Sequence, residues 1–81
     1  MVWIVRWSEK AQAALSRIDE ADKIITAVGE ASKDPFRYTK RLVGKPLNSL
    51  RVGKYRVIMQ LHRNIMLIYV VTVSHRSRVY D

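Results

Sequence analysis

The sequence predicts an α+β fold, in which a helical hairpin packs on one face of a small, mainly antiparallel sheet in the order β-α-α-β-β-β. Three observations predict it: an apolar, β-branched segment at the start, two segments with apolar residues at helical spacing, and alternating apolar and polar residues in the second half. At 81 residues, the chain is expected to form one domain, 1–81, because so short a chain encloses a single core.

The first half is expected to hold one strand and two helices. Residues 2–7 are apolar at nearly every position, as in a buried strand, and Ser8 is expected to cap the helix that follows. Asp19 is expected to cap the second helix, and the Asp34-Pro35 step to end the helical region, since proline disfavours helical geometry at the residue before it. The apolar stripes of the two helices are Ala11, Ala14, Leu15 and Ile18, and Ala21, Ile24, Ile25 and Val28.

The second half is expected to hold a basic loop and three strands. The loop runs for about ten residues after Pro35 and includes Gly44 and Pro46 as turn signals. Alternating residues on both sides of Gly53-Lys54 predict a β-hairpin with a two-residue turn. Residues 65–73 are apolar and β-branched and predict a central strand.

Charge is segregated along the chain. The net charge is +8, yet residues 1–36 contain five basic and six acidic side chains, whereas residues 37–81 contain ten basic side chains and only Asp81 as an acid. One half of the fold should therefore carry a strong positive field, which suits a polyanion and nucleic acid first. A solvated, solubilising surface is the alternative interpretation, and Lys40, Arg41 and Lys45 are expected to be solvated loop residues that act electrostatically.

The hairpin places two arginines together. If Gly53-Lys54 is the turn, Arg51 faces Arg56 across the ladder on the side opposite the helices. Like charges so placed are destabilising unless they share an anion, and two guanidinium groups suit the oxygens of a phosphodiester. Each arginine alone would also be compatible with an ordinary exposed strand position. An odd residue count in the next hairpin loop would add Thr72, Ser74 and Arg76 to this face, and an even count would reverse that register.

The C-terminal segment concentrates polar side chains that RNA cleavage can use: His75, Arg76, Arg78 and Tyr80. Arginines stabilise the charge that accumulates when a ribose 2′-hydroxyl attacks its phosphate, and a tyrosine ring can hold an unstacked base. An idle surface histidine and a fraying terminal aromatic are the alternatives for His75 and Tyr80.

Other classes of site are not expected. The chain has no cysteine, which excludes disulfides and thiolate zinc sites and suits a reducing cytosol. Its two histidines have no carboxylate cluster nearby, so we expect no metal and no cofactor. No apolar run approaches the ~20 residues that span a bilayer, so a soluble, cytoplasmic protein without a membrane partner is expected.

The order and spacing of several motifs resemble the RelE/ParE toxin superfamily over essentially the whole chain. The motifs are Trp7-Ser8-Glu9-x-Ala11, Asp34-Pro35, Leu42-x-Gly44, the stretch from Leu50 to Ile58, Val73-Ser74-His75-Arg76 and Val79-Tyr80. The resemblance implies the β-α-α-β-β-β fold and a RelB-type antitoxin that wraps and neutralises the toxin. For the RelE branch, it implies ribosome-dependent, metal-independent endoribonuclease cleavage of mRNA in the A site, which inhibits translation.

The resemblance also assigns roles by position. Arg56 resembles the arginine that stabilises the phosphorane-like transition state, Arg76 the arginine near the leaving group, and Tyr80 the tyrosine that stacks on the substrate base. Arg51 resembles a phosphate-side contact and Arg78 a supporting basic residue. Bacterial RelE proteins carry lysines on the strand that here offers Asn48 and Ser49. Lys45, Lys54 and His75 are the alternatives for the group that takes the proton.

Two other functions compete with mRNA cleavage. A ParE-like toxin shares the fold but poisons DNA gyrase through protein contacts, and it generally lacks the arginine-tyrosine set. A non-catalytic nucleic-acid-binding module would explain the charge but does not require the C-terminal cluster. The joint presence of Arg56, Arg76 and Tyr80 favours the RelE branch.

Overall fold

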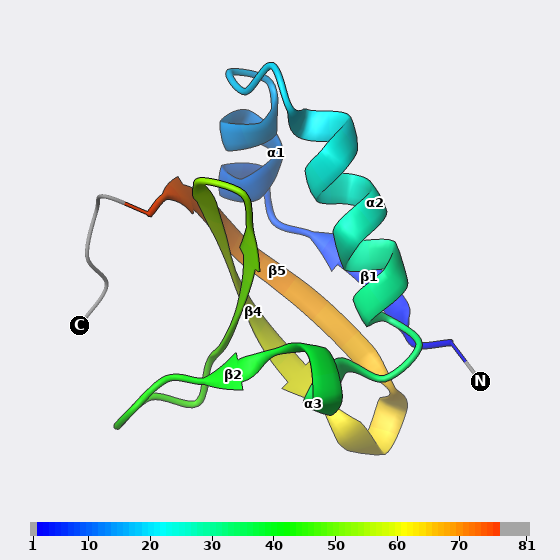
Figure 1. Ribbon diagram of the computed structural model, residues 1–81. Helices are drawn as coiled ribbons and strands as arrows, with labels where there is room; N and C mark the ends of the chain where they lie inside the picture. The colour runs from blue at the N-terminus through cyan, green and yellow to red at the C-terminus, as the bar shows by residue number, and fades with distance from the viewer. Residues whose placement is uncertain (1, 77–81) are drawn as a thin grey trace.

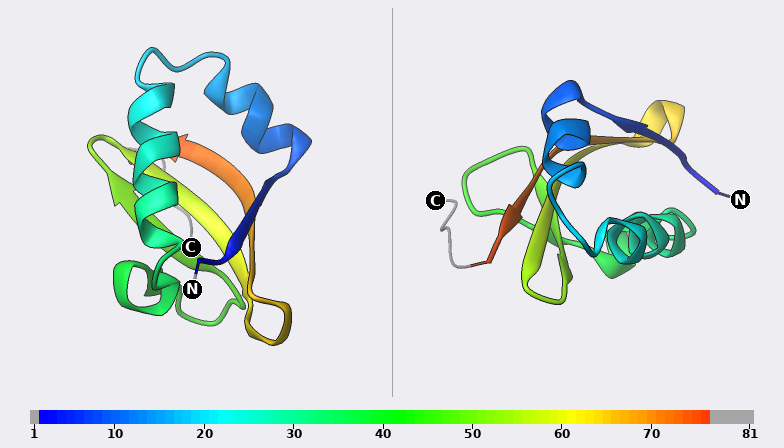
Figure 2. Two further views of the ribbon diagram at one scale, coloured as in Figure 1. Left: turned by 90° about the vertical axis from the view of Figure 1, so that its right-hand side faces the viewer. Right: turned by 90° about the horizontal axis from the view of Figure 1, so that it is seen from above.

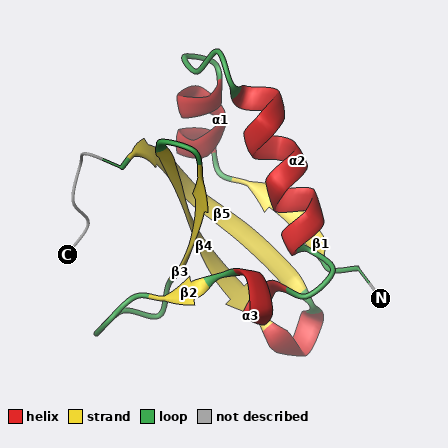
Figure 3. Cartoon of the chain, viewed as in Figure 1, coloured by secondary structure: helices red, strands yellow, loops and turns green. Residues whose placement is uncertain are grey.

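A computed structural model describes residues 2–76 and confirms the α+β fold (Figures 1 and 3). Its elements are β1 (Ile4–Trp7), α1 (Glu9–Leu15), α2 (Ala21–Ala31), α3 (Pro35–Tyr38), β2 (Lys40–Arg41), β3 (Asn48–Val52), β4 (Tyr55–His62), a 3-10 turn (Arg63–Ile65) and β5 (Leu67–His75). The strands form one sheet in the order β1-β5-β4-β3-β2. β1 is parallel to β5, and the other neighbours are antiparallel, as expected for a mainly antiparallel sheet.

The helical hairpin covers one face of the sheet (Figure 2). Side chains from α1, α2 and the strands make a single buried core, which includes Ala11, Ile24, Val28, Val52, Val57, Met59, Ile68 and Val70. Leu50, Tyr55 and Leu61 pack against this core, so the alternation expected for the β3-β4 hairpin is confirmed. The residues that alternate with these core residues along β3 and β4 lie on the opposite face of the sheet. Within residues 2–76, no helix is long and apolar enough to cross a membrane.

Ser8 caps α1 as predicted, and it also fixes the helix to the sheet. Its hydroxyl oxygen accepts a hydrogen bond from the Ala11 amide at 3.0 Å, and the same hydroxyl donates to the carbonyl oxygen of Val71 at 2.6 Å. The expected cap of the second helix was wrong. The Ile24 amide donates to the carbonyl oxygen of Glu20, so the first helical bond begins at Glu20 and Asp19 lies before the cap.

The expectation that Asp34-Pro35 ends the helical region was also wrong. α2 already ends at Ala31, and Pro35 is instead the first residue of α3. Proline is well suited to that position, because its missing amide has no partner in the first turn of a helix. The region expected to be a loop therefore contains one short helix and one short strand.

A bulge in β5 decides which residues share a face with Arg56. Four residues, an even number, separate the paired residues His62 and Leu67, and this register alone would turn Thr72 and Ser74 toward the helices. The ladder shifts between Ile58 and Met59, which pair with Thr72 and Val70 and leave Val71 as the extra residue. Arg56 therefore pairs with Ser74, which is one of the two registers that the sequence left open, although the bulge and not an odd loop is the reason.

Candidate nucleic-acid interface

Arg51 and Arg56 are direct cross-strand neighbours, as the sequence predicted. Val52 and Tyr55 close the hairpin, and Gly53 has a φ of +57°, whereas Lys54 has no positive φ. A glycine with positive φ at the first of two turn residues is the pattern of a type II′ hairpin turn, whose twist matches that of the strands. The turn thus fixes the register that brings both guanidinium groups to the sheet face opposite the helices, which we call the arginine face.

Five basic side chains line one pocket of about 530 Å³ on this face. They come from four elements: Arg37 from α3, Lys40 and Arg41 from β2, Arg51 from β3 and Arg56 from β4. No acidic residue lines the pocket with them. An anion bound there would be surrounded by positive charge, as a phosphodiester requires.

The segment around β2 reaches the pocket because it is fastened to β3. Lys40 pairs with Ser49 and Arg41 with Asn48. The Asn48 side-chain amide donates to the Thr39 hydroxyl oxygen at 3.0 Å, and that hydroxyl donates to the Pro35 carbonyl oxygen at 2.6 Å. Lys40 and Arg41 are therefore sheet residues paired with β3, so the expectation of a loop was wrong for these two, although both side chains are exposed as expected.

Lys45 lies elsewhere, in the turn between β2 and β3. Its backbone amide donates to the Leu42 carbonyl oxygen at 3.4 Å, and its side chain does not line the pocket. Gly44, with a φ of +72°, allows this turn. In the sequence, the turn residues Gly44 and Pro46, with a pair of polar residues on each side, indicate this second hairpin.

The positive charge of the arginine face is not neutralised within the described part of the chain. Among residues 2–76, the one ion pair is Lys33–Glu30, at 3.2 Å near the end of α2. The Nε of Arg56 is buried with no hydrogen-bond partner among these residues, and the same holds for the Oγ of Ser74, its cross-strand neighbour. A buried donor without a partner costs about 1–3 kcal/mol, so the site favours a ligand that brings acceptor oxygens.

One buried apolar side chain, Ile58, lies on the same face, two residues along β4 from Arg56. Ile58 lies between Ser49 and Thr72 in the register and is 1% exposed, although it is on the side of the sheet away from the helices. Burial of Ile58 excludes water next to Arg56, and the attraction between a guanidinium group and an anion is stronger where water is excluded.

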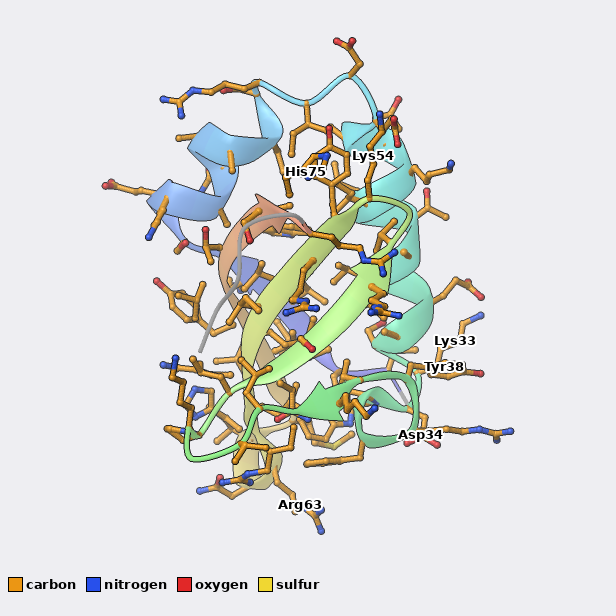
Figure 4. All side chains as sticks on the ribbon, turned by 60° about the vertical axis from the view of Figure 1, so that its left-hand side comes forward. Lys33, Asp34, Tyr38, Lys54, Arg63 and His75 are labelled. Carbon is orange, nitrogen blue, oxygen red and sulfur yellow. The ribbon has the colours of Figure 1, made fainter. Side chains whose placement is uncertain are left out.

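Arg76 is held at the turn of the β3-β4 hairpin. Its Nη1 donates to the Gly53 carbonyl oxygen at 3.2 Å, and its backbone amide donates to the Lys54 carbonyl oxygen at 2.7 Å. Arg76 is thus placed at the end of the strands that carry Arg51 and Arg56, although it does not line their pocket. Figure 4 shows Lys54 at this same end, and Arg63 at the opposite end of the sheet.

His75 is not brought to the arginine face. It pairs with Tyr55, whose side chain faces the helices, and the two rings pack edge to face with their centroids 5.6 Å apart. Figure 4 shows His75 beside the hairpin turn, near Lys54. Arg78 and Tyr80, the remaining candidates from the sequence, lie outside the described residues.

Arg37 and Tyr38 also line the pocket, although no pattern in the sequence singles out either one. The Arg37 guanidinium lies 5.9 Å from the centre of the Tyr38 ring. Among the described residues, no group of three or more His, Cys, Asp or Glu side chains could hold a metal ion.

Comparisons with known proteins place this fold. A family model described as the ParE toxin of the type II toxin-antitoxin system, parDE, matches residues 5–80. No curated protein matches the chain. A chain of a RelBE toxin-antitoxin complex from Mycobacterium tuberculosis is similar, with a TM-score of 0.76, 25% identity, and coverage of 94% of this chain and 100% of that chain.

Two structures of lower sequence identity show the same fold. A chain of the archaeal RelE-RelB complex from Pyrococcus horikoshii OT3 has a TM-score of 0.80 at 20% identity and covers 98% of this chain and 100% of its own. A chain of the intact E. coli RelBE complex has a TM-score of 0.76 at 18% identity and covers 94% of this chain and 99% of its own.

Proposed function

The chain belongs to the ParE toxin family of type II toxin-antitoxin systems, within the RelE/ParE superfamily, and we propose that within this superfamily it is a RelE-type mRNA endoribonuclease. It cleaves mRNA in the ribosomal A site by attack of a ribose 2′-hydroxyl on the adjacent phosphate, and so inhibits translation. The observation that supports this proposal most is the Arg51-Arg56 pair, set in a pocket of five cations without a described carboxylate partner.

The reaction requires negative charge to be stabilised at the phosphate. In the attack, the 2′-oxygen forms a bond to phosphorus, the bond to the 5′-oxygen breaks, and a proton moves from the 2′-hydroxyl to the departing oxygen. Arg56 binds the phosphoryl oxygens as charge accumulates, and its buried Nε supplies a donor that has no other described partner. Arg51 binds the same phosphate from the neighbouring strand.

The remaining roles are those that the resemblance to RelE toxins implies. Arg76, fixed at the hairpin turn, acts at the leaving group, while Tyr80 stacks on the substrate base and Arg78 supports the RNA backbone. Lys45 and Lys54 contribute to binding the RNA and are the candidates for proton transfer. His75 is directed to the other side of the sheet, so its contact with RNA is made outside the pocket.

The partners follow from the same proposal. A RelB-type antitoxin neutralises the toxin, in line with the toxin-antitoxin complexes that share this fold. The ribosome and its mRNA are the targets, and both are strongly anionic, which fits a net charge of +8. Such a toxin acts in the cytoplasm, where its target is.

A ParE-like function is the second candidate, and the matched family model is the observation that favours it. In that case the toxin would poison DNA gyrase through protein contacts, and the arginine face would not need to bind a scissile phosphate. The paired arginines beside an unpartnered buried donor favour RNA cleavage over this candidate.

One experiment separates the two candidates. Primer extension on mRNA bound to programmed ribosomes should show cuts at codon positions with the wild-type toxin and none with Arg76→Ala. An Arg63→Ala variant is the matched control, because it removes the same charge at the far end of the sheet. Gyrase-dependent DNA breaks, with no cut in mRNA, would establish the ParE-like function instead.

A further inference from the structure

A second hollow lies on the other side of β5 from the arginine face. It is a groove of about 700 Å³ between α1 and the end of β5. Lys10 and Arg17 line it from the helix side, and Ser74 and His75 line it from the strand. Ala14 and Ile18 add apolar surface, and no acidic side chain lines the groove. Since residues 1–36 are nearly neutral as a whole, charge counting alone did not single out Lys10 or Arg17.

The groove exists because β5 is longer than its neighbour. β1 pairs with β5 only from Leu67 to Val70, which leaves the rest of β5 without a paired strand on that side. Ser8 ends the pairing by binding the Val71 carbonyl oxygen, and it starts α1 at the same point. The helix then runs along the remainder of β5 and leaves the hollow between them.

The groove adjoins the arginine face at one residue pair. Arg56 lines the pocket of the arginine face, and its cross-strand partner Ser74 lines the groove. The buried Oγ of Ser74 has no hydrogen-bond partner among the described residues. A polyanionic chain with one phosphate at Arg56 therefore meets Ser74 next, and beyond Ser74 the basic groove.

We propose that the groove between α1 and β5 is a second phosphate-binding subsite, which holds the single-stranded RNA that extends from the linkage at Arg56. This subsite rests on the proposed function. Lys10, Arg17 and His75 contact the phosphates of the flanking nucleotides, and the apolar residues of the groove contact their sugars and bases. The basic lining of the groove, with no acidic side chain, and its position next to Arg56 favour RNA over a docked protein.

The test compares short and long RNA on two double variants. Lys10→Gln/Arg17→Gln removes two charges from the groove, and Lys23→Gln/Lys33→Gln removes two charges from the region of α2. All four side chains are exposed, so both variants should fold. Fluorescence anisotropy would measure the affinity of each for oligouridylates of about three and about ten nucleotides, as salt is varied.

The groove variant should bind the short RNA like the wild type and the long RNA less well. Two lost phosphate contacts lower the salt slope for long RNA by about 1.4, at about 0.7 for each contact. Between about 50 and about 200 mM salt, the wild type should therefore lose about sevenfold more affinity for long RNA than the groove variant loses. The α2 variant should keep the wild-type slope.

Equal slopes for the two double variants would overturn the subsite. Unchanged RNA binding together with weaker antitoxin binding would also overturn it and would make the groove a protein contact. Failure of the proposed function gives a different result: the wild type would leave mRNA on ribosomes uncut, whatever the groove variant does with oligouridylate.

Discussion

The Arg51-Arg56 pair should make the isolated toxin less stable than a variant that lacks one of the two charges. Replacing Arg51 by glutamine keeps a polar, unbranched side chain on an exposed strand position and removes the like-charge contact across the ladder. The two guanidinium groups have no described carboxylate partner, so nothing on residues 2–76 offsets their repulsion. We therefore expect Arg51→Gln to stabilise the fold while it weakens RNA binding.

The size of the gain follows from the register. Charged pairs directly opposite each other on a sheet change stability by about 0.2–1 kcal/mol, and a like-charge pair has the unfavourable sign. For a domain of this size, that free energy of unfolding corresponds to an increase in Tm of about 1–8 °C. The increase should shrink in about 1 M salt, where screening acts over about 3 Å.

Thermal unfolding followed by circular dichroism would measure this effect. Lys23→Gln is the control, since Lys23 is exposed on α2 and has no arginine across a ladder. Inorganic phosphate should remove the difference in Tm between the wild type and Arg51→Gln, because a ligand at ten times its Kd stabilises the native wild type by about 1.4 kcal/mol. A lower Tm for Arg51→Gln, or an increase in Tm that salt and phosphate leave unchanged, would refute the claim that the arginine pair destabilises the fold unless an anion is bound.

Three further substitutions test how the site is supported. Ser8→Ala should lower the free energy of unfolding, measured in urea, by about 0.5–2 kcal/mol because the α1 cap is removed. A loss no larger than that of Ser16→Ala would count against the cap. Met59→Ala should cost about 2–5 kcal/mol because Met59 is fully buried, whereas Ile65→Ala, at 63% exposed, should cost little; similar midpoints for both would contradict the assigned core. Asn48→Ala should loosen the α3-β2 segment from β3 and weaken RNA binding in anisotropy assays, because the Thr39 hydroxyl loses its bond to Asn48; unchanged affinity would show that β2 is held in place without this contact.

The parts of the fold that the sequence predicted correctly depend on local patterns. Alternation on both sides of Gly53-Lys54 gave the hairpin and its register, because a two-residue turn leaves only one way to pair the strands. Ser8 was recognised as a cap because the helix starts directly after it. The same turn places Arg51 opposite Arg56 from the sequence alone.

The parts that could not be predicted depend on contacts between distant segments. α3 and β2 are held by Asn48, which lies nine residues after Thr39 in the chain, and no apolar periodicity marks residues 37–41. The bulge at Val71 is fixed by Ser8 from the other end of the chain. The place of Arg37, Lys40 and Arg41 in the pocket therefore depends on the folded sheet and cannot be predicted from local patterns.

The central claim is that Arg56 stabilises charge at a scissile RNA phosphate, and a comparison of two constants for Arg56→Ala tests it most directly. These are the single-turnover rate of mRNA cleavage on programmed ribosomes and the Kd for those ribosomes. Loss of a group that acts mainly in the transition state should lower the rate by about 100-fold or more and change the Kd far less. Equal losses in rate and affinity would contradict the claim and leave Arg56 as a binding residue only.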